Sequence, residues 1–341
     1  MMPAHYARIA GLGRGLPSRV VTNDELASMV DTSDEWIRTR TGIVERRFVS
    51  EGESTATLAA SAAQAALAQA RILPDDVDLI LVATSTPDYP LFPSAACLLQ
   101  AALGSKRAGA FDLAAACSGF VYGLITATQF IRTGAYRCVL VVGADALSPF
   151  VDLRDRTTCV LFGDGAGAAV VTASDDPGGL ISFVLGADGS GAEHLIVPAG
   201  GSRSPLTQES LAARENTIRM NGREVYRFST TTPADALVKA AADAGVRVAD
   251  LDLVVAHQAN VRILQTIARN LDVPEDLFYT NVSRFGNTSA ASVPLALYDA
   301  AADGRLRPGA LVGLLGFGAG LTWATAIWRW HGLCEQHPSA G

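Results

Sequence analysis

The sequence lacks the features that mark membrane-spanning, secreted and nucleic-acid-binding chains. It has no run of about 18 apolar residues, and no basic start followed by a continuous apolar stretch opens the chain. It has no block of five or more basic residues, and its formal net charge is −7. We therefore expect a cytoplasmic protein that binds neither a membrane nor nucleic acid.

Cysteine and histidine are scarce, with five of each. The cysteines include no Cys-x-x-Cys pair and their number is odd, which excludes a disulfide framework and a zinc cluster. We expect reduced thiols, no metal, and one cysteine free to act as a nucleophile. Three histidines lie near the chain ends and one in a polar segment. His257, which follows the apolar run Leu251–Ala256, is therefore the best placed for chemistry.

What the sequence does contain is a globular composition arranged as alternating strand and helix patterns. It has 341 residues, of which 49% are hydrophobic and 18% charged, enough for two domain-sized units. Apolar runs such as residues 77–84 and 138–144 are separated by alanine-rich helical segments such as residues 54–70. This alternation predicts an α/β fold with a largely parallel sheet.

The second half of the chain repeats the first. Residues 65–81 align without gaps with the stretch that ends at residue 255, at a constant offset of 174. The helix expected from Cys117 to Gly134 matches one from Asn287 to Gly304 at an offset of 170. Two packed copies of one pattern would form layered sheets and helices with a pseudo-twofold relation. We expect Cys117 and Asn287 to occupy matching helix starts, and His257 to lie at a strand end, where parallel sheets bind ligands.

Cys117 lies where an apolar run gives way to helical spacing. Residues 110–113 resemble a strand, and apolar residues from Phe120 to Ile131 then recur at steps of four, three and four. Free amides and the positive end of the helix dipole favour a thiolate at such a position, so we expect a lowered pKa and a nucleophilic sulfur. The alternative is that Cys117 packs in the core, as most free cysteines do.

Three other residues also allow a structural and a functional interpretation. A histidine after a strand, such as His257, is more often structural than catalytic, and Asn287 alone would be a helix cap. Trp36 with Arg38 and Arg40 could hold a nucleotide base and its phosphates, or form a surface helix with one buried tryptophan. Together with a cysteine at a helix start, His257 and Asn287 favour a catalytic site.

Long motifs run in one order along the chain, from about residue 8 to residue 328. They are TSDEWIRTRTGIVERR, FDLAAACSGF, LFGDGAGAAV, HQANVRI, GNTSAASVPLAL and GFGAGLTWA. In these motifs the sequence resembles the β-ketoacyl-[acyl-carrier-protein] synthase III family of thiolase-like condensing enzymes. The resemblance implies duplicated halves in a five-layered α/β/α/β/α arrangement and usually a homodimer. We expect one half over residues 1–176, the other over residues 177–334, and a tail over residues 335–341.

The resemblance implies a decarboxylating Claisen condensation of a short acyl-coenzyme A with malonyl-acyl carrier protein. This acyltransferase reaction initiates type II fatty-acid synthesis and needs no metal or redox cofactor. Cys117 would carry the acyl group as a thioester. His257 and Asn287 would donate hydrogen bonds to the enolate formed by decarboxylation, and the backbone amides of Cys117 and Ala319 would form the oxyanion hole.

The resemblance also implies which residues bind coenzyme A and the starter group, namely Trp36, Arg40, Arg156, Asn260, Phe317 and Phe92. The first three would surround the adenine and phosphate end, Asn260 would contact the pantetheine arm, and Phe317 would lie beside the active cysteine. Phe92 would close the acyl pocket from the partner subunit, which favours a short starter such as acetyl. Arg262 would contact the acidic acyl carrier protein.

Two other functions stay open. A paralogue in a polyketide or quinolone-type secondary-metabolite pathway would share the three catalytic residues but use another starter or acceptor. The second is a non-catalytic scaffold that binds a carrier protein, and the presence of Cys117, His257 and Asn287 together argues against it. A degradative thiolase is disfavoured, because that chemistry needs a second cysteine in a C-terminal glycine loop and Cys334 lies in the tail.

Overall fold

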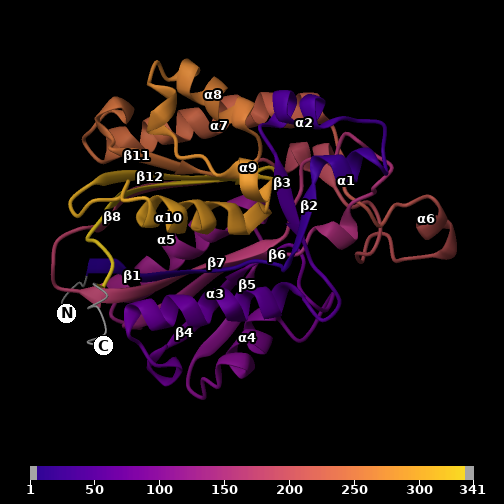
Figure 1. Ribbon diagram of the computed structural model, residues 1–341. Coiled ribbons are helices and arrows are strands. Elements are labelled where there is room, and N and C mark those ends of the chain that lie inside the picture. Colours follow the sequence, from indigo (N-terminus) through magenta and orange to yellow (C-terminus); the bar gives the residue numbers. More distant parts are fainter. Residues whose placement is uncertain (1–5, 335–341) are drawn as a thin grey trace, which may run out of the picture.

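The computed structural model describes residues 6–334, so the predicted tail, residues 335–341, lies outside this range. Two sheets form the core (Figure 1). The first has the strand order β1-β7-β6-β4-β5, with β1 (Tyr6–Gly15), β7 (Gly165–Ser174), β6 (Cys138–Asp145), β4 (Leu79–Ala83) and β5 (Gly109–Leu113). The second has the order β11-β12-β13-β8, with β11 (Leu253–Ala256), β12 (Leu311–Gly318), β13 (Thr322–Arg329) and β8 (Gly179–Ala187).

Helices separate and cover the two sheets, which gives five layers (Figure 1). Between the sheets lie α5 (Gly119–Arg132) and α10 (Ser292–Ala302). The outer face of the first sheet is covered by α3 (Thr55–Ala70) and α4 (Ala95–Leu103). The outer face of the second sheet is covered by α7 (Gly222–Asp243) and α8 (Val261–Asn270). The predicted five-layered α/β/α/β/α arrangement is confirmed.

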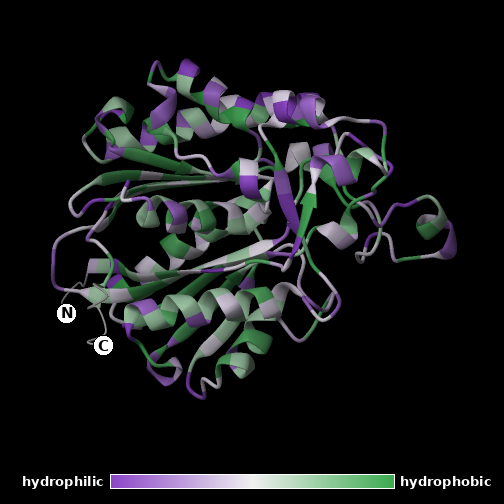
Figure 2. Cartoon of the chain, viewed as in Figure 1, coloured by the Kyte–Doolittle hydropathy of each residue, from purple (hydrophilic) through white to green (hydrophobic). Residues whose placement is uncertain are grey.

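Small residues let the helices lie close to the sheets. α5 and α10 contact both sheets and are mostly apolar, whereas α7 and α8 turn many polar residues outward (Figure 2). A Cβ on Gly143 of β6 would lie 2.2 Å from the carbonyl oxygen of Ala290. A Cβ on Gly13 of β1 would lie 2.1 Å from the carbonyl oxygen of Ala62 in α3. Larger side chains at these glycines would push the layers apart.

Both sheets are mixed, so the prediction of a largely parallel sheet is wrong. β4 pairs in parallel with β5 and β6, and β11 with β12. β7 pairs antiparallel with β1 and β6, and β13 pairs antiparallel with β12 and β8. The reason is that a parallel neighbour needs a crossover, and neither residues 146–164 nor the turn between β12 and β13 contains an α-helix.

Strand pairing establishes how the two halves correspond. Leu79 of β4 pairs with Val139 of β6, and Leu253 of β11 pairs with Val312 of β12. The first strand of each pair therefore repeats at an offset of 174, as predicted, and the second at 173. The first sheet ends in sequence with β7 and the second begins with β8. The division at residues 176 and 177 into two domains stays a prediction, because α5 and α10 share one central layer.

The helix starts correspond differently from the prediction. The 3-10 turns η2 (Ala116–Ser118) and η7 (Ser289–Ala291) directly precede α5 and α10, and they repeat at an offset of 173. Cys117 therefore matches Ala290, and its predicted match with Asn287 is wrong. α10 has 11 residues and α5 has 14, so the offset of 170 holds only at the helix ends.

The remaining elements lie beside the two sheets, mostly at one end (Figure 1). They are α1 (Asn23–Ala27), α2 (Asp34–Thr41), α6 (Gln208–Ala212), α9 (Val282–Phe285), β2 (Arg19–Thr22), β3 (Glu45–Phe48), β9 (Leu195–Ile196) and β10 (Arg219–Met220). α6 lies on an arm that projects from the body (Figure 1). Among residues 6–334, no helix combines the length and the apolar character needed to cross a bilayer.

Candidate active site

Cys117 lies in the middle of the turn η2, between β5 and α5, and its side chain is buried. The turn is tight, because Ala116 has a φ of 44°, in the left-handed region. Gly318 at the end of β12 passes close to the cysteine, and a Cβ there would lie 2.9 Å from the Cys117 Sγ. The second sheet therefore packs directly against the thiol of the first half.

Burial raises the pKa of the Cys117 thiol to about 11. Hydrogen bonds from the Ser289 hydroxyl and from the amides of Cys117 and Ala319 oppose this rise, but burial has the larger effect on the pKa. The prediction of a lowered pKa is therefore wrong for the free protein. Its physical reason is that α5 begins only at Gly119, and desolvation outweighs the helix-end field at the preceding turn.

Two backbone amides face the sulfur, those of Cys117 itself and of Ala319, which follows β12. The Thr322 hydroxyl lies 3.0 Å from the carbonyl oxygen of Ala115 and 2.9 Å from that of Ala319. It therefore links the segment before Cys117 to the segment that carries the second amide. A negative oxygen that develops next to the sulfur would meet both amides, which is the geometry of an oxyanion hole.

His257 directly follows β11 and is buried. Its backbone amide donates to the carbonyl oxygen of Leu315, and its ring meets the Phe317 ring edge-on, with 5.1 Å between centroids. Its Nδ1 lies 2.6 Å from the Oγ of Ser292. Burial lowers the pKa of His257 to about 3, so the imidazole is neutral at physiological pH. A neutral imidazole offers one N–H donor and one acceptor.

Asn287 lies between α9 and the turn η7. Its backbone amide donates to the carbonyl oxygen of Leu161, which fixes the residue to the first half of the chain. Its Oδ1 accepts from the backbone amide of Ser289 at 2.9 Å. This bond uses the acceptor of the carboxamide, so the side chain presents its NH₂ group as a donor. The structural alternative, a helix cap, therefore applies only to the turn η7, because α10 begins at Ser292 without a side-chain cap.

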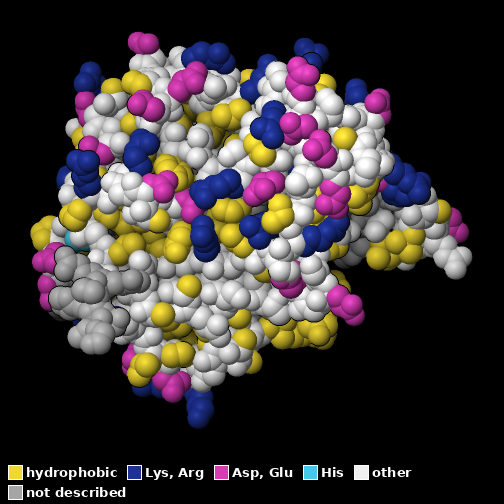
Figure 3. Space-filling model, in the orientation of Figure 1, with side chains coloured by type: hydrophobic (Ala, Val, Ile, Leu, Met, Phe, Trp, Pro, Cys, Tyr) yellow, Lys and Arg dark blue, Asp and Glu magenta, His cyan; other side chains and the backbone are white. Residues whose placement is uncertain are grey.

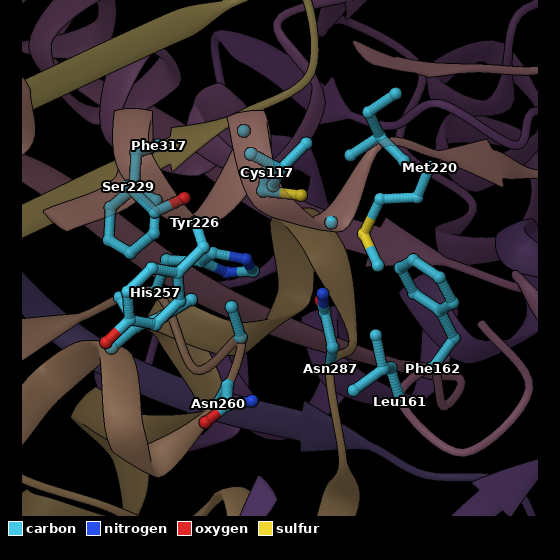
Figure 4. A pocket seen from close by; sticks show the side chains of 16 residues that line it. Cys117, Leu161, Phe162, Met220, Tyr226, Ser229, His257, Asn260, Asn287 and Phe317 are labelled. Atoms are coloured by element: carbon cyan, nitrogen blue, oxygen red, sulfur yellow. The ribbon is translucent and has the colours of Figure 1, made fainter. Parts of the chain in front are cut away.

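Cys117, His257 and Asn287 line one cavity of about 110 Å³ and converge on it from three elements (Figure 4). Phe317, which the sequence predicts beside the cysteine, lines it as well. Several other residues line the cavity without having been predicted to do so, namely Leu161, Phe162, Leu195, Met220, Val225, Tyr226, Ser229 and Ile263. Most of these belong to β10, α7 and α8. Their contacts with the motif residues depend on how these elements pack, which local sequence patterns do not indicate.

A second, wider cavity of about 370 Å³ meets the first at Cys117. It extends past Phe162 to the segment from Leu195 to Gly201. Its lining is mostly apolar and includes Leu147, Phe150, Ile196, Val197, Ala199 and Ile218. The sulfur therefore lies at the junction of a narrow cavity, which His257 and Asn287 line, and a wider one. Sequence reasoning missed the segment 195–201, whose only signal is a pair of glycines in a loop.

The arginines that the sequence pairs with Trp36 lie around its ring. The guanidinium carbons of Arg40 and Arg156 lie 5.7 Å and 5.3 Å from the ring centroid, close enough for cation–π attraction. Asn260, at the start of α8, donates from its amide to the carbonyl oxygen of Arg40 at 3.3 Å and lines the narrow cavity. These residues therefore mark a path from the outer surface to Cys117. Arg38 turns away to an ion pair within α2.

Phe92 and Arg262 lie apart from this path. Phe92 is 81% exposed in the loop before α4 and lines neither cavity, so its predicted place at the acyl pocket stays a prediction. Arg262 is exposed on α8. On the visible face, charged side chains gather over α2, α7 and α8, while the surface over α3 carries few (Figure 3).

Within the part of the chain that the structure describes, no group of three His, Cys, Asp or Glu side chains is arranged to hold a metal ion.

Known proteins match the chain along nearly its whole length. Residues 111–189 match the family described as 3-oxoacyl-[acyl-carrier-protein (ACP)] synthase III, and residues 241–330 match its C-terminal part. The β-ketoacyl-[acyl-carrier-protein] synthase III of Roseiflexus sp. strain RS-1 is 51% identical over 327 residues, which are 96% of this chain and 99% of that protein.

Solved structures match over the same extent. The 3-oxoacyl-[acyl-carrier-protein] synthase III of Aquifex aeolicus VF5 is 43% identical with a TM-score of 0.88, covering 95% of this chain and 100% of that one. The priming β-ketosynthase of the R1128 polyketide biosynthetic pathway is 35% identical with a TM-score of 0.89, covering 97% and 98%. With this fold, this identity and this coverage, the chain belongs to the 3-oxoacyl-[acyl-carrier-protein] synthase III family of thiolase-like enzymes.

Proposed function

We propose that this protein condenses a short acyl-coenzyme A with malonyl-acyl carrier protein, with loss of CO₂, and so initiates type II fatty-acid synthesis. The observation that carries this proposal is a buried thiol at the junction of two cavities, with two backbone amides on one side and an imidazole and a carboxamide on the other. Condensation needs this arrangement, because one site must hold an acyl group and stabilise two different oxyanions in turn.

In the first step the Cys117 sulfur attacks the carbonyl carbon of the acyl-coenzyme A. The S–C bond to Cys117 forms, the bond to the coenzyme A sulfur breaks, and the thiol proton leaves with the released coenzyme A. The amides of Cys117 and Ala319 hold the tetrahedral oxyanion. A pKa of about 11 keeps the resting thiol protonated, so this proton transfer is part of the step rather than an event that precedes it.

In the second step the malonyl group loses CO₂ and the electron pair of the broken C–C bond forms an enolate. The imidazole of His257 and the NH₂ group of Asn287 donate hydrogen bonds to the enolate oxygen. Both donors are neutral and buried, so the new negative charge meets fixed dipoles with little water to compete. The enolate carbon then attacks the acyl-cysteine, which gives 3-oxoacyl-acyl carrier protein and a Cys117 thiolate that takes a proton from solvent.

The path from Trp36 to the cavity suits coenzyme A. The aromatic ring and the two guanidinium groups beside it match an adenine base and its phosphates. Asn260 lies between this surface and the cavity, where it would contact the pantetheine arm. Arg262, exposed on α8 near the same entrance, supplies positive charge for an acidic carrier protein.

We also propose a homodimer in which Phe92 of one subunit closes the wide cavity of the other. Leu91 and Phe92 are 82% and 81% exposed, which is unusual for adjacent large apolar side chains on the surface of a monomer. A phenylalanine that fills part of this cavity would favour a short starter such as acetyl. Sedimentation velocity should give the mass of two chains, and Phe92→Asp should lower it to that of one. A wild-type monomer at micromolar concentration would rule out the dimer.

The function itself is tested by separating its two half-reactions. After mixing with acetyl-coenzyme A, the intact mass of the wild-type chain should rise by one acetyl group, and Cys117→Ser should prevent this. The exposed cysteine provides the matched control, since Cys97→Ser should be acetylated normally. His257→Ala and Asn287→Ala should be acetylated, but should lose about 100-fold or more in the decarboxylation of malonyl-acyl carrier protein.

The outcomes separate the competing functions. A chain that gains no acetyl group is a scaffold or uses another starter, and a panel of acyl-coenzyme A starters distinguishes these two results. A chain that is acetylated but ignores malonyl-acyl carrier protein belongs to another pathway with a different acceptor. Normal turnover in both His257→Ala and Asn287→Ala would contradict their assignment as donors to the enolate.

A further inference from the structure

We infer that Ser292 is a positioning residue that holds the proton of His257 on Nε2, the ring nitrogen left to face the cavity. The inference rests on the proposed role of His257 as a donor to the enolate and adds the group that makes it a donor. Ser292 lies at the start of α10, in the central layer, and touches neither cavity. It therefore acts on the reaction only through the imidazole.

The contact is short and buried. Oγ of Ser292 lies 2.6 Å from Nδ1 of His257, and the two residues are 1% and 2% exposed. Burial keeps the imidazole neutral, so only one of its two nitrogens carries a proton. The direction of this one hydrogen bond therefore decides which face of the ring donates.

Counting protons fixes the direction. Among the described residues, the Ser292 hydroxyl has no hydrogen-bond partner other than His257. If Nδ1 carried the proton and donated, the hydroxyl hydrogen would be buried without an acceptor, which costs about 1–3 kcal/mol. If the hydroxyl donates to Nδ1, both groups are satisfied. The proton of the neutral ring then lies on Nε2.

The matching positions in the first half of the chain support a specific role for the contact between Ser292 and His257. At the offsets given by strand pairing, His257 and Ser292 match Ala83 and Gly119. A Cβ on Gly119 would lie 2.9 Å from the Cβ of Ala83, so these two positions face each other in that half as well. The fold alone brings the positions together, but only the second half places a hydrogen-bonding pair there.

The direct test is the position of the proton in the wild-type protein. Two-bond ¹H–¹⁵N correlation spectra of protein labelled with ¹⁵N-histidine distinguish the two neutral tautomers. Comparison with His257→Asn assigns the signals of this ring. The inference requires the Nε2–H tautomer at pH 7. A proton on Nδ1 in the wild-type protein would overturn it, whatever the variants do.

Variants test the consequence for the reaction. Ser292→Ala should be acetylated at Cys117 within about twofold of the wild-type rate, because the amides that hold the first oxyanion are untouched. Its decarboxylation of malonyl-acyl carrier protein should fall about 10- to 100-fold, since the donor at Nε2 is no longer fixed. Ser292→Cys, which is close in size and a weaker donor, should lie between Ser292→Ala and the wild-type protein.

The matched control removes another buried hydroxyl from the same half. Ser182 of β8 donates to the carbonyl oxygen of Ala240 at 2.6 Å, and neither residue lines the narrow or the wide cavity at Cys117. Ser182→Ala should keep the Nε2–H tautomer and wild-type decarboxylation. An equal loss in Ser182→Ala and Ser292→Ala would show that lost packing is the cause and refute the inference. If His257→Ala itself decarboxylates normally, the proposed function fails while the tautomer measurement still stands on its own.

Discussion

In each half of this molecule, the turn before the central helix packs against the end of a strand from the other half, but the residues at the two contacts differ. In one copy the turn supplies Cys117 and the neighbouring strand end supplies Gly318, where a Cβ would lie 2.9 Å from the sulfur. In the other copy the turn supplies Ala290 and the strand end supplies Asp145. There the carboxylate accepts the amide of Ala290 at 3.1 Å. In the first copy a glycine leaves room for a buried thiol, and in the second a carboxyl group holds the turn by a hydrogen bond.

The difference teaches how a duplicated fold acquires one active site. Asp145 is buried and also accepts from Thr84, the Ser85 amide and Thr86, so it ties the second turn to the first sheet. Burial raises the pKa of Asp145, and hydrogen bonds from backbone amides and threonine hydroxyls oppose this rise and hold the carboxyl group in place. The first half therefore carries both Cys117 and the carboxylate that holds the turn η7 of the second half, whereas Ala290 in that turn has no nucleophilic side chain.

The largest effect on the reaction is expected when a methyl group is added at Gly318, where the first copy has no side chain. In Gly318→Ala the new Cβ would lie 2.7 Å from the Cys117 Cβ and 2.9 Å from Sγ, so the thiol or the amide of Ala319 must move. Acetylation of Cys117 should fall about 100- to 1,000-fold, as expected when an oxyanion donor is displaced. The initial rate of acetylation by intact mass measures this.

The control for this variant is Gly189→Ala, because a Cβ at Gly189 meets no atom within 4 Å. It should react like the wild-type protein. Circular dichroism and urea unfolding of Gly318→Ala show whether the fold is retained. A folded Gly318→Ala with normal acetylation would mean that the contact between β12 and the turn η2 does not set the geometry of the thiol.

Local patterns in the sequence predict much of this fold. The alanine-rich helix expected over residues 54–70 is α3, and the side chain of Ser54 caps its start by accepting from the amide of Thr57. The repeat at an offset of 174 is a property of two strands that occupy equivalent places in the two sheets. The motif residues Cys117, His257 and Asn287 do meet at one cavity, although 170 residues separate the first from the last.

What the sequence does not predict depends on burial and on long-range packing. The pKa of Cys117 rises because the second sheet covers the turn, and no property of residues 111–123 indicates that cover. The contact of Ser292 with His257 is hidden for the same reason, because the partner of a serine at the start of a buried helix depends on which element packs beside it. The reversed direction of β7 and β13 depends on connections without helices, which alternating patterns do not distinguish from loops.

The smallest effect is a difference in stability with pH between the two copies of the strand end. Ala83 cannot take up a proton, whereas His257, at the matching position, titrates only at about pH 3 in the folded chain. The unfolded chain binds this proton near pH 6.5, so the free energy of unfolding contributed by His257 is complete above pH 6.5 and lost as the pH falls. At pH 5 the loss should be about 2 kcal/mol, since each pH unit below 6.5 is worth about 1.4 kcal/mol.

Urea unfolding of the wild-type protein and His257→Ala at pH 7 and pH 5 isolates the contribution of His257 to the free energy of unfolding, because the other titrating groups are common to both chains. Equal losses in the two proteins would mean that the folded imidazole takes up a proton freely, and a ring that does so would not be the fixed neutral donor that the reaction needs.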